Sequence, residues 1–152
     1  MPKVLKLAID TAEHFWIEAG AMSGPPAHRH QIELPNDLAE FFDDDSRDDE
    51  EVPLRLAGQP IHWRPLTYRG TDYGQWTDIW RLGLLTPRMG GPKYAQRVVM
   101  FTRVVERTNQ GWLTFYELQV ANASSAQATR WRATSTKLGT TGGHAGRDYG
   151  WF

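Results

Sequence analysis

The sequence predicts a mostly β fold, a barrel or sandwich of short strands with one or two short helices, in a single domain. The 152 residues are enough for one domain of ordinary size and too few for two. Apolar residues make up 40% and charged residues 23%, which is typical of a globular protein that can bury a core. Short runs rich in aromatic and β-branched residues alternate with Gly, Pro and Asn clusters, which indicates strands joined by turns.

The first half of the chain predicts several strands and one helix. Strands are expected at residues 4–9, 14–18, 30–34, 52–57 and 61–68. Residues 19–29 are rich in Gly and Pro and predict a loop. Asn36 is expected to cap a short helix. The buried face of that helix would consist of Leu38, Ala39, Phe41 and Phe42.

The second half contains the clearest element, a β-hairpin. Residues 97–106 (RVVMFTRVVE) and 112–120 (WLTFYELQV) are two β-rich runs joined by the turn signal RTNQG. A strand at 76–85 is expected before this hairpin, after a turn at 70–75. A loop is expected at 86–93, and a last strand is expected near residues 130–135.

Charge is distributed unevenly along the chain. Residues 1–60 hold 5 basic and 13 acidic residues, a net charge of −8, whereas residues 61–152 hold 12 and 5, a net charge of +7. Most of the negative charge lies in the run 43–51 (DDDSRDDEE). Because such a block of like charges repels itself, we interpret the run as a solvated loop. It lacks the glycine and the alternate acids of a calcium loop, which argues against a metal site.

The basic half has a composition that is typical of nucleic-acid binding. Ten of its twelve basic residues are Arg, and Trp and Tyr residues lie between them. The guanidinium fork binds phosphate oxygens or the edge of guanine and stacks on rings. A sheet with a basic outer face over a Trp-containing core would have the same composition, so both interpretations stay open.

No catalytic site, cofactor site or metal site is predicted. None of the four Lys residues has an acidic residue or a His two positions before it, as the common nuclease motifs require. The chain has no phosphate-binding Gly-rich loop with its Lys, and the absence of Cys excludes thiolate chemistry. His28 and His30 have a spacing that zinc ligands use, but we prefer to interpret the pair as part of a polar loop or as a DNA contact. The sequence therefore favours a binding module.

Three segments, in order, resemble the B3-like DNA-recognition domain of type II restriction endonucleases of the EcoRII and BfiI kind, which is related to the plant B3 transcription-factor domain. They are residues 4–42, the RLG at 81–83 followed by VVMFTRV and TFYELQV, and the ending GGHAGRDYGWF. The resemblance implies a seven-stranded open pseudobarrel with short helices at its ends. It also implies two loop-bearing arms that grip DNA and read bases in the major groove. The acidic run has no counterpart in that pattern.

The resemblance also implies which residues contact DNA. The first arm would span residues 19–31, the second arm residues 69–81, and the ending 137–149 would hold the DNA backbone. The implied contacts are Ser23, His28, Arg29, His30 and Gln31 in the first arm, Arg69, Asp72, Tyr73, Gln75, Trp76, Thr77, Asp78, Trp80 and Arg81 in the second, and Lys137, Thr140, Thr141, His144 and Arg147 in the ending.

The chemistry of these residue types agrees with base reading. Gln75 can pair with adenine, an Arg with guanine, and Asp72 or Asp78 can accept from cytosine. Glycines in the ending allow backbone amides to approach phosphates closely. Trp76 and Trp80 share one face of the predicted strand, so we expect at least one of them in the core.

We therefore expect residues 1–152 to form one non-catalytic DNA-binding domain, the target-recognition or effector part of a larger restriction endonuclease. The expected partners are double-stranded DNA with a short specific target and a nuclease domain in the same or a partner chain, with no membrane. The expected location is the prokaryotic cytoplasm, at the nucleoid. Two alternatives stay open: a small nuclease with unrecognised catalytic residues, and a basic-faced barrel that binds an acidic protein.

Overall fold

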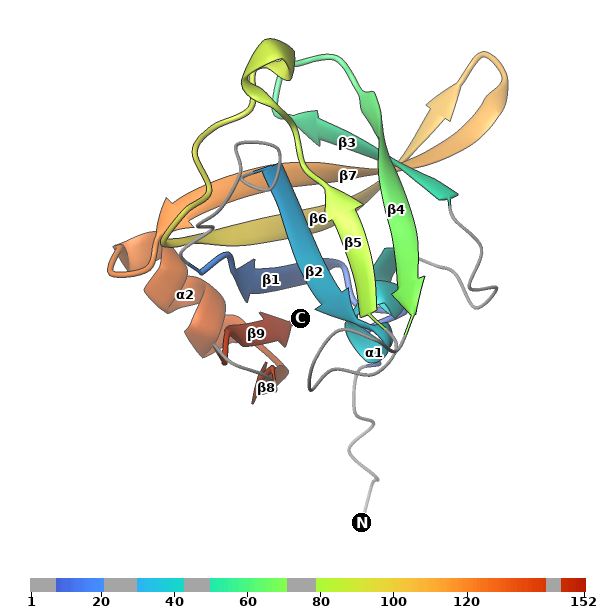
Figure 1. Cartoon of the computed structure of the whole chain (residues 1–152). Coiled ribbons are helices and arrows are strands. Elements are labelled where there is room, and N and C mark those ends of the chain that lie inside the picture. The colour runs from blue at the N-terminus through green and yellow to red at the C-terminus, as the bar shows by residue number, and fades with distance from the viewer. Residues whose placement is uncertain (1–7, 21–29, 43–49, 71–78, 142–145) are drawn as a thin grey trace.

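The computed structural model describes residues 8–20, 30–42, 50–70, 79–141 and 146–152. These residues form one sheet of nine strands that curls into an open half-barrel (Figure 1). The mostly β fold agrees with the sequence-based prediction, whereas the predicted number of seven strands is wrong. The strands are β1 (His14–Glu18), β2 (Gln31–Pro35), β3 (Glu50–Leu56), β4 (His62–Gly70), β5 (Ile79–Gly83), β6 (Arg97–Thr108), β7 (Gly111–Asn122), β8 (Lys137–Thr140) and β9 (Asp148–Trp151).

The strand order in the sheet is β2-β5-β4-β3-β7-β6-β1-β9-β8, so β2 and β8 are its two edges. All neighbours are antiparallel except β3 and β7, which run parallel. Two of the nine strands, the short C-terminal pair β8 and β9, lie where the sequence predicts no strand. KLGT has a single apolar residue beside its glycine, and DYGW has only Tyr149 and Trp151 around its glycine, so both runs are too short to indicate a strand.

The main core lies on the concave side of the curled sheet. Strand β1 contributes Phe15 and Ile17 to it, and both are fully buried. Aromatic rings fill its centre: Phe42 lies 5.0 Å from Phe101 and 5.0 Å from Tyr116, measured between ring centroids. Burial of these side chains is the main favourable contribution to folding.

A short helical segment closes one end of the half-barrel. It consists of α1 (Asn36–Ala39) and a 3-10 turn, η2 (Glu40–Phe42), and its buried residues are the four that the sequence predicts. Asn36 is not the cap, however, because the helix begins at Asn36 and Pro35 takes the cap position. The Asn36 side chain instead accepts a hydrogen bond from Trp80 Nε1 at 2.8 Å.

The region predicted as a last strand forms a helix, α2 (Ala126–Thr134). The sequence RWRATS alternates like a strand, but the Ser125 side chain caps the helix by accepting from the Ala128 amide at 3.2 Å. Ala128 and Trp131, three positions apart, then face the protein and are buried. They form a second, smaller cluster with Trp16, Val98, Met100 and Ala121, on the convex side of β1, β6 and β7.

The predicted hairpin is present and extends further than predicted. Strands β6 and β7 pair from Arg97 with Asn122 to Thr108 with Gly111, which leaves a two-residue turn. Gly111 has φ 113°, a conformation that a residue with a Cβ rarely adopts, and this explains the glycine after the turn. The end of this hairpin projects beyond the half-barrel (Figure 1).

The remaining elements differ from their predicted bounds in small ways. Strand β3 begins within the acidic run, at Glu50, and the predicted loop at 86–93 contains a 3-10 turn, η3 (Pro87–Met89). Ile9 lies in a turn, and the rest of the predicted strand 4–9 is mostly outside the described residues. In the part of the chain that is described, no helix has the length and apolar character needed to cross a membrane.

Candidate nucleic-acid interface

The two predicted arms join the same pair of strands at opposite ends. Strands β2 and β5 are antiparallel neighbours, and Gln31 pairs with Gly83 while Pro35 pairs with Ile79. The first arm leads into β2 at His30, whose carbonyl accepts from the Leu84 amide at 2.7 Å. The second arm leads from Gly70 to Ile79, which pair with each other at the other end of β5. The segments 21–29 and 71–78 themselves lie outside the described residues.

A polar row crosses the outer face of the sheet between these two ends. Glu33 on β2 pairs with Arg81 on β5, and Arg81 pairs with Thr67 on β4. The alternate residues of β2, Ile32 and Leu34, are buried in the main core, so Glu33 and Arg81 face away from it. Arg81 Nη2 donates to Glu33 Oε1 at 3.0 Å. The two side chains are 22% and 38% exposed, respectively.

Arg147 connects the C-terminal segment to the same strand. Its Nη2 donates to the Glu33 carbonyl oxygen at 2.6 Å. Burial lowers the pKa of Arg147, while the charges of Glu33 and Glu18 act in the opposite direction. Since β2 is an edge strand, this bond satisfies a backbone carbonyl and links the segment before β9 to the far edge of the sheet.

The other described residues of the predicted ending have different environments. Lys137 is exposed at the start of β8. Thr140 donates to Asp148 Oδ1 at 2.8 Å, and the buried Thr141 accepts from the Arg147 amide at 3.0 Å. Lys137 is therefore positioned for an external contact, whereas the two threonines make contacts within the C-terminal segment.

His30 and Trp80 also have defined surroundings. The His30 ring lies edge-on to Tyr94, with 6.4 Å between centroids, and within the described residues its Nδ1 atom is buried without a hydrogen-bond partner. Trp80 is 1% exposed and packs on Tyr68, so it belongs to the core rather than to the interface. This agrees with the expectation that at least one of Trp76 and Trp80 is a core residue.

Most of the remaining predicted contacts lie outside the described residues. Arg69 falls within strand β4, but its side chain is outside the described part. The undescribed predicted residues are Ser23, His28, Arg29, Asp72, Tyr73, Gln75, Trp76, Thr77, Asp78 and His144. The expectation that residues 43–51 form a solvated loop also falls largely on undescribed residues.

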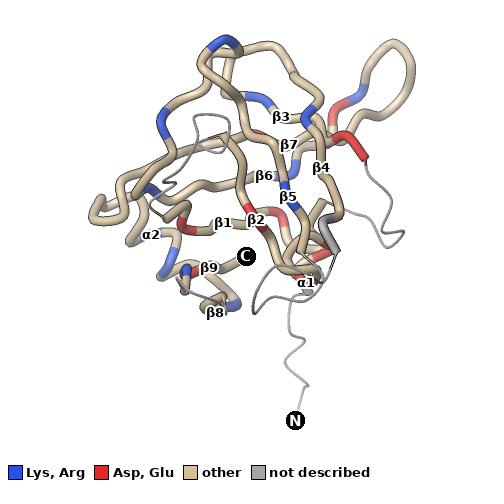
Figure 2. Tube along the Cα trace, viewed as in Figure 1, with Lys and Arg blue, Asp and Glu red and all other residues tan. Residues whose placement is uncertain are grey.

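Within the described residues, Figure 2 shows Lys and Arg positions distributed over several strands and helices rather than along one of them. Several of the arginines serve the fold. Arg103 donates to the carbonyls of Asp10, Ala12 and Phe41, at 2.9, 2.8 and 2.7 Å. Arg64 donates to the Leu84 carbonyl at 3.0 Å. The arginine count of the second half is therefore a poor measure of a nucleic-acid surface.

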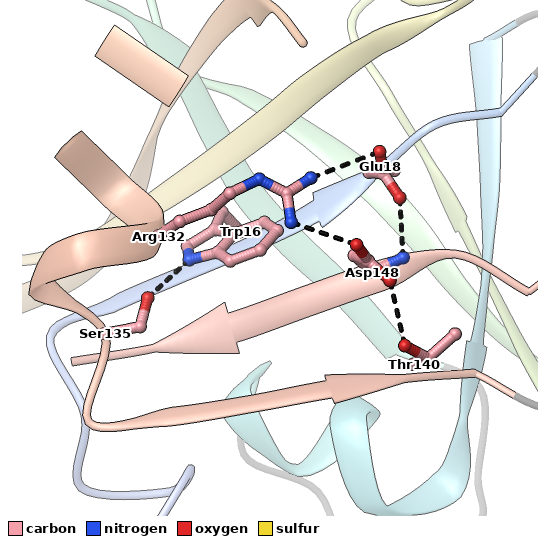
Figure 3. A network of polar contacts seen from close by, with 6 residues as sticks. All are labelled: Trp16, Glu18, Arg132, Ser135, Thr140 and Asp148. Carbon is pink, nitrogen blue, oxygen red and sulfur yellow. Dashed lines mark hydrogen bonds and ion pairs between the residues drawn. The ribbon is translucent and has the colours of Figure 1, made fainter. Parts of the chain in front are cut away.

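A polar network joins α2 to β1 and β9 (Figure 3). Arg132 donates to Asp148 at 2.9 Å and to Glu18 at 3.3 Å, and its guanidinium lies 5.0 Å from the Trp16 ring centroid. Hydrogen bonds from Arg132 and Thr140 lower the pKa of Asp148. Each charged side chain of the network has a hydrogen-bond partner within it, so we interpret it as a structural link.

No metal site is found in the part of the chain that the structure describes. That part contains no group of three or more His, Asp or Glu residues placed to hold a metal ion. His28, one of the two closely spaced histidines, is not among the described residues.

Sequence reasoning missed Glu33 as a member of the candidate site. Its side chain contacts Arg81, 48 positions away along the chain. Only the pairing of β2 with β5 brings them together, and strand patterns in a sequence do not reveal which strands pair.

Comparisons with protein-family models, with curated proteins and with solved structures find no match for this chain.

Proposed function

We propose that this chain binds double-stranded DNA sequence-specifically, as the target-recognition domain of a restriction endonuclease whose nuclease domain lies elsewhere. The proposed surface is the outer face of β2 and β5, together with the two chain segments that flank it. The observation that carries the proposal is the polar row with Glu33 and Arg81, which lies between the points where both predicted arms join the sheet.

The dimensions of this surface fit the proposal. Four residue steps separate the Gln31–Gly83 pair from the Pro35–Ile79 pair. At roughly 3.3 Å per residue the two arm attachments are about 13 Å apart. The major groove of B-DNA is about 12 Å wide, so arms attached at this spacing can reach both walls of one groove.

The side chains on this surface suit base reading and backbone contact. An Arg such as Arg81 can donate to guanine O6 and N7, and a Gln such as Gln31 can pair with adenine. Lys137, exposed on β8, has the charge to contact a phosphate. The β2–β5 surface thus carries groups that can distinguish bases, and Lys137 on β8, at the opposite edge of the sheet order, adds a group that can recognise the backbone.

Selection of bound duplexes from a random pool tests the proposal directly. We expect enrichment of one short sequence, and an affinity for it that falls linearly with salt on logarithmic axes, with a slope near −0.9 per phosphate contact. Absence of duplex binding at low salt, or binding without any enriched sequence, would contradict the proposal. Cleavage of plasmid DNA by the purified chain with Mg²⁺ would instead indicate a nuclease.

A specific observation supports a second candidate function, protein binding through the β6–β7 hairpin. Trp112 is 72% exposed and Val105 is 55% exposed, and both lie near the turn of the hairpin, where Trp112 pairs with Arg107 and Val105 pairs with Thr114. Large exposed apolar side chains are common at protein interfaces. Under this alternative, Trp112→Ala would abolish binding of a protein partner, whereas we expect it to leave duplex binding unchanged.

A further inference from the structure

We infer that Glu33 is a specificity-determining residue, and that Glu33 and Arg81 together recognise one G·C base pair. The inference rests on the proposed function and adds a residue that the sequence-based assignment does not include. It follows from three features of the pair: its position, its hydrogen bonding and its donor–acceptor pattern.

The position of the pair brings a carboxylate into the centre of a proposed DNA surface. Glu33 and Arg81 lie in register on neighbouring strands, midway between the two arm attachments. A carboxylate there repels phosphates, so it lowers the affinity for DNA unless it accepts a hydrogen bond from a base. If the surface binds DNA, Glu33 therefore favours sequences that place a hydrogen-bond donor opposite its carboxylate over sequences that do not.

The hydrogen bonding of the pair leaves an acceptor available. Arg81 Nη2 contacts one carboxylate oxygen, Glu33 Oε1, at 3.0 Å. Within the described residues, the other carboxylate oxygen, Glu33 Oε2, accepts no hydrogen bond. The 38% exposure of the Glu33 side chain lets a ligand on the outer face reach that oxygen.

The donor and acceptor groups of the pair complement a G·C pair in the major groove. Guanine presents two acceptors, N7 and O6, beside the amino donor N4 of its cytosine partner. Arg81 supplies guanidinium donors for guanine N7 and O6, and Glu33 supplies an acceptor for cytosine N4. The two side chains lie next to each other in the row, as the two bases do in the pair. The Glu33–Arg81 contact holds the guanidinium beside the carboxylate, so this pair of side chains can form hydrogen bonds to both bases of one base pair.

The test is duplex selection with the wild-type chain and the Glu33→Gln variant, which keeps the size of the side chain and removes its charge. We expect the wild type to enrich one position as G·C, and Glu33→Gln to lose at least about fivefold of the preference at that position only. Glu117→Gln is the matched control. Glu117 forms a similar cross-strand ion pair with Arg55, at 2.6 Å, on β7 and β3. The control should keep the wild-type preference.

The outcomes separate this inference from the proposed function. If the wild type binds a specific sequence and Glu33→Gln keeps the same preference at every position, the inference is wrong and the proposed function stands. If the wild type binds no duplex, the proposed function is wrong, and the inference with it. Thermal unfolding of each variant, together with binding by Glu33→Ala, distinguishes an altered preference from a loss of folded protein.

Discussion

At the scale of single residues, arginine side chains in this protein divide between internal and external contacts. Arg103 is an internal case: it donates to three backbone carbonyls, and its guanidinium lies 4.7 Å from the Phe41 ring centroid. Arg81 lies on the outer face and contacts a carboxylate that is more exposed than itself. The fork geometry of the guanidinium suits both uses, so only the surroundings of each Arg decide between them.

Arg81→Ala tests whether the Arg81 side chain on the outer face contacts DNA bases. We expect the change to weaken binding to the selected sequence by about 1–3 kcal/mol and to relax the choice at one base pair, because a base contact is lost. Fluorescence anisotropy with the selected duplex and with single-base variants measures both effects. Arg130→Ala, at an exposed position of α2, is the control. Equal affinity of Arg81→Ala and wild type for every duplex would show that Arg81 does not read bases.

The contact between Arg132 and Asp148, an internal contact of an arginine, can be tested through the pH dependence of stability. The pKa of Asp148 is lowered from the ordinary value of 3.8, mainly by hydrogen bonds from Arg132 and Thr140. The ionised carboxylate therefore stabilises the fold above that value, and this contribution is lost as pH falls through the lowered pKa. We expect Asp148→Asn to be less stable than wild type at neutral pH, with a difference that shrinks as pH falls below the ordinary value of 3.8 and through the lowered pKa. Urea unfolding across this range measures the difference, and a pH-independent difference would contradict the assignment.

At the scale of elements, the C-terminal segment is attached to the sheet by close packing at a glycine and by a side-chain hydrogen bond. A Cβ on Gly150 would lie 2.8 Å from the Lys137 carbonyl oxygen and 2.8 Å from Trp16 Cε2, so the close pairing of β9 with β1 and β8 requires glycine there. Trp16 also donates to Ser135 Oγ at 2.7 Å, at the end of α2. Helix α2 thus bridges the long hairpin and the final strands.

The cap of α2 has a measurable contribution. We expect Ser125→Ala to lower the free energy of unfolding by about 1 kcal/mol, because the Ala128 amide loses its acceptor at the helix start. Ser124→Ala, one position earlier and exposed, should change it little. Chemical denaturation of both variants measures the comparison. Equal stability of the two would mean that the Ser125 side chain does not stabilise the helix.

At the scale of the whole molecule, the half-barrel has an opening between its two edge regions, and Arg147 reaches across it. The residue lies directly before β9 and donates to the carbonyl of Glu33 on β2. This bond joins strands that are far apart in the sheet order. The sequence-based interpretation of Arg147 as a phosphate contact thus competes with a structural role that occupies part of its guanidinium.

Arg147→Ala tests that structural role. Loss of a hydrogen bond from a charged donor is expected to lower the free energy of unfolding by about 1.5–3 kcal/mol. We also expect faster hydrogen exchange of the amides in β2 and β9, because the two edges lose a direct link. Exchange measured by mass spectrometry, with Arg130→Ala as control, checks this. Unchanged exchange in both strands would show that the bond does not restrain them.

The sequence determined much of the local structure. The pattern HFWIE specifies β1, and the two β-rich runs around RTNQG specify the long hairpin, because both follow from neighbouring residues. Residues 130–135 show the limit of such patterns. There, an alternating sequence forms a helix because Ser125 caps it and Trp131 finds a cluster to pack against.

The tertiary structure decided which of these elements meet. It added the pair β8 and β9, which are too short to stabilise themselves and depend on pairing with β1. It also brought Glu33 to Arg81 and Arg147 to Glu33, and it turned other arginines inward. The physical reason is the same in each case: side-chain periods and turn signals are local, whereas strand pairing and ion pairing depend on contacts between residues distant in the chain.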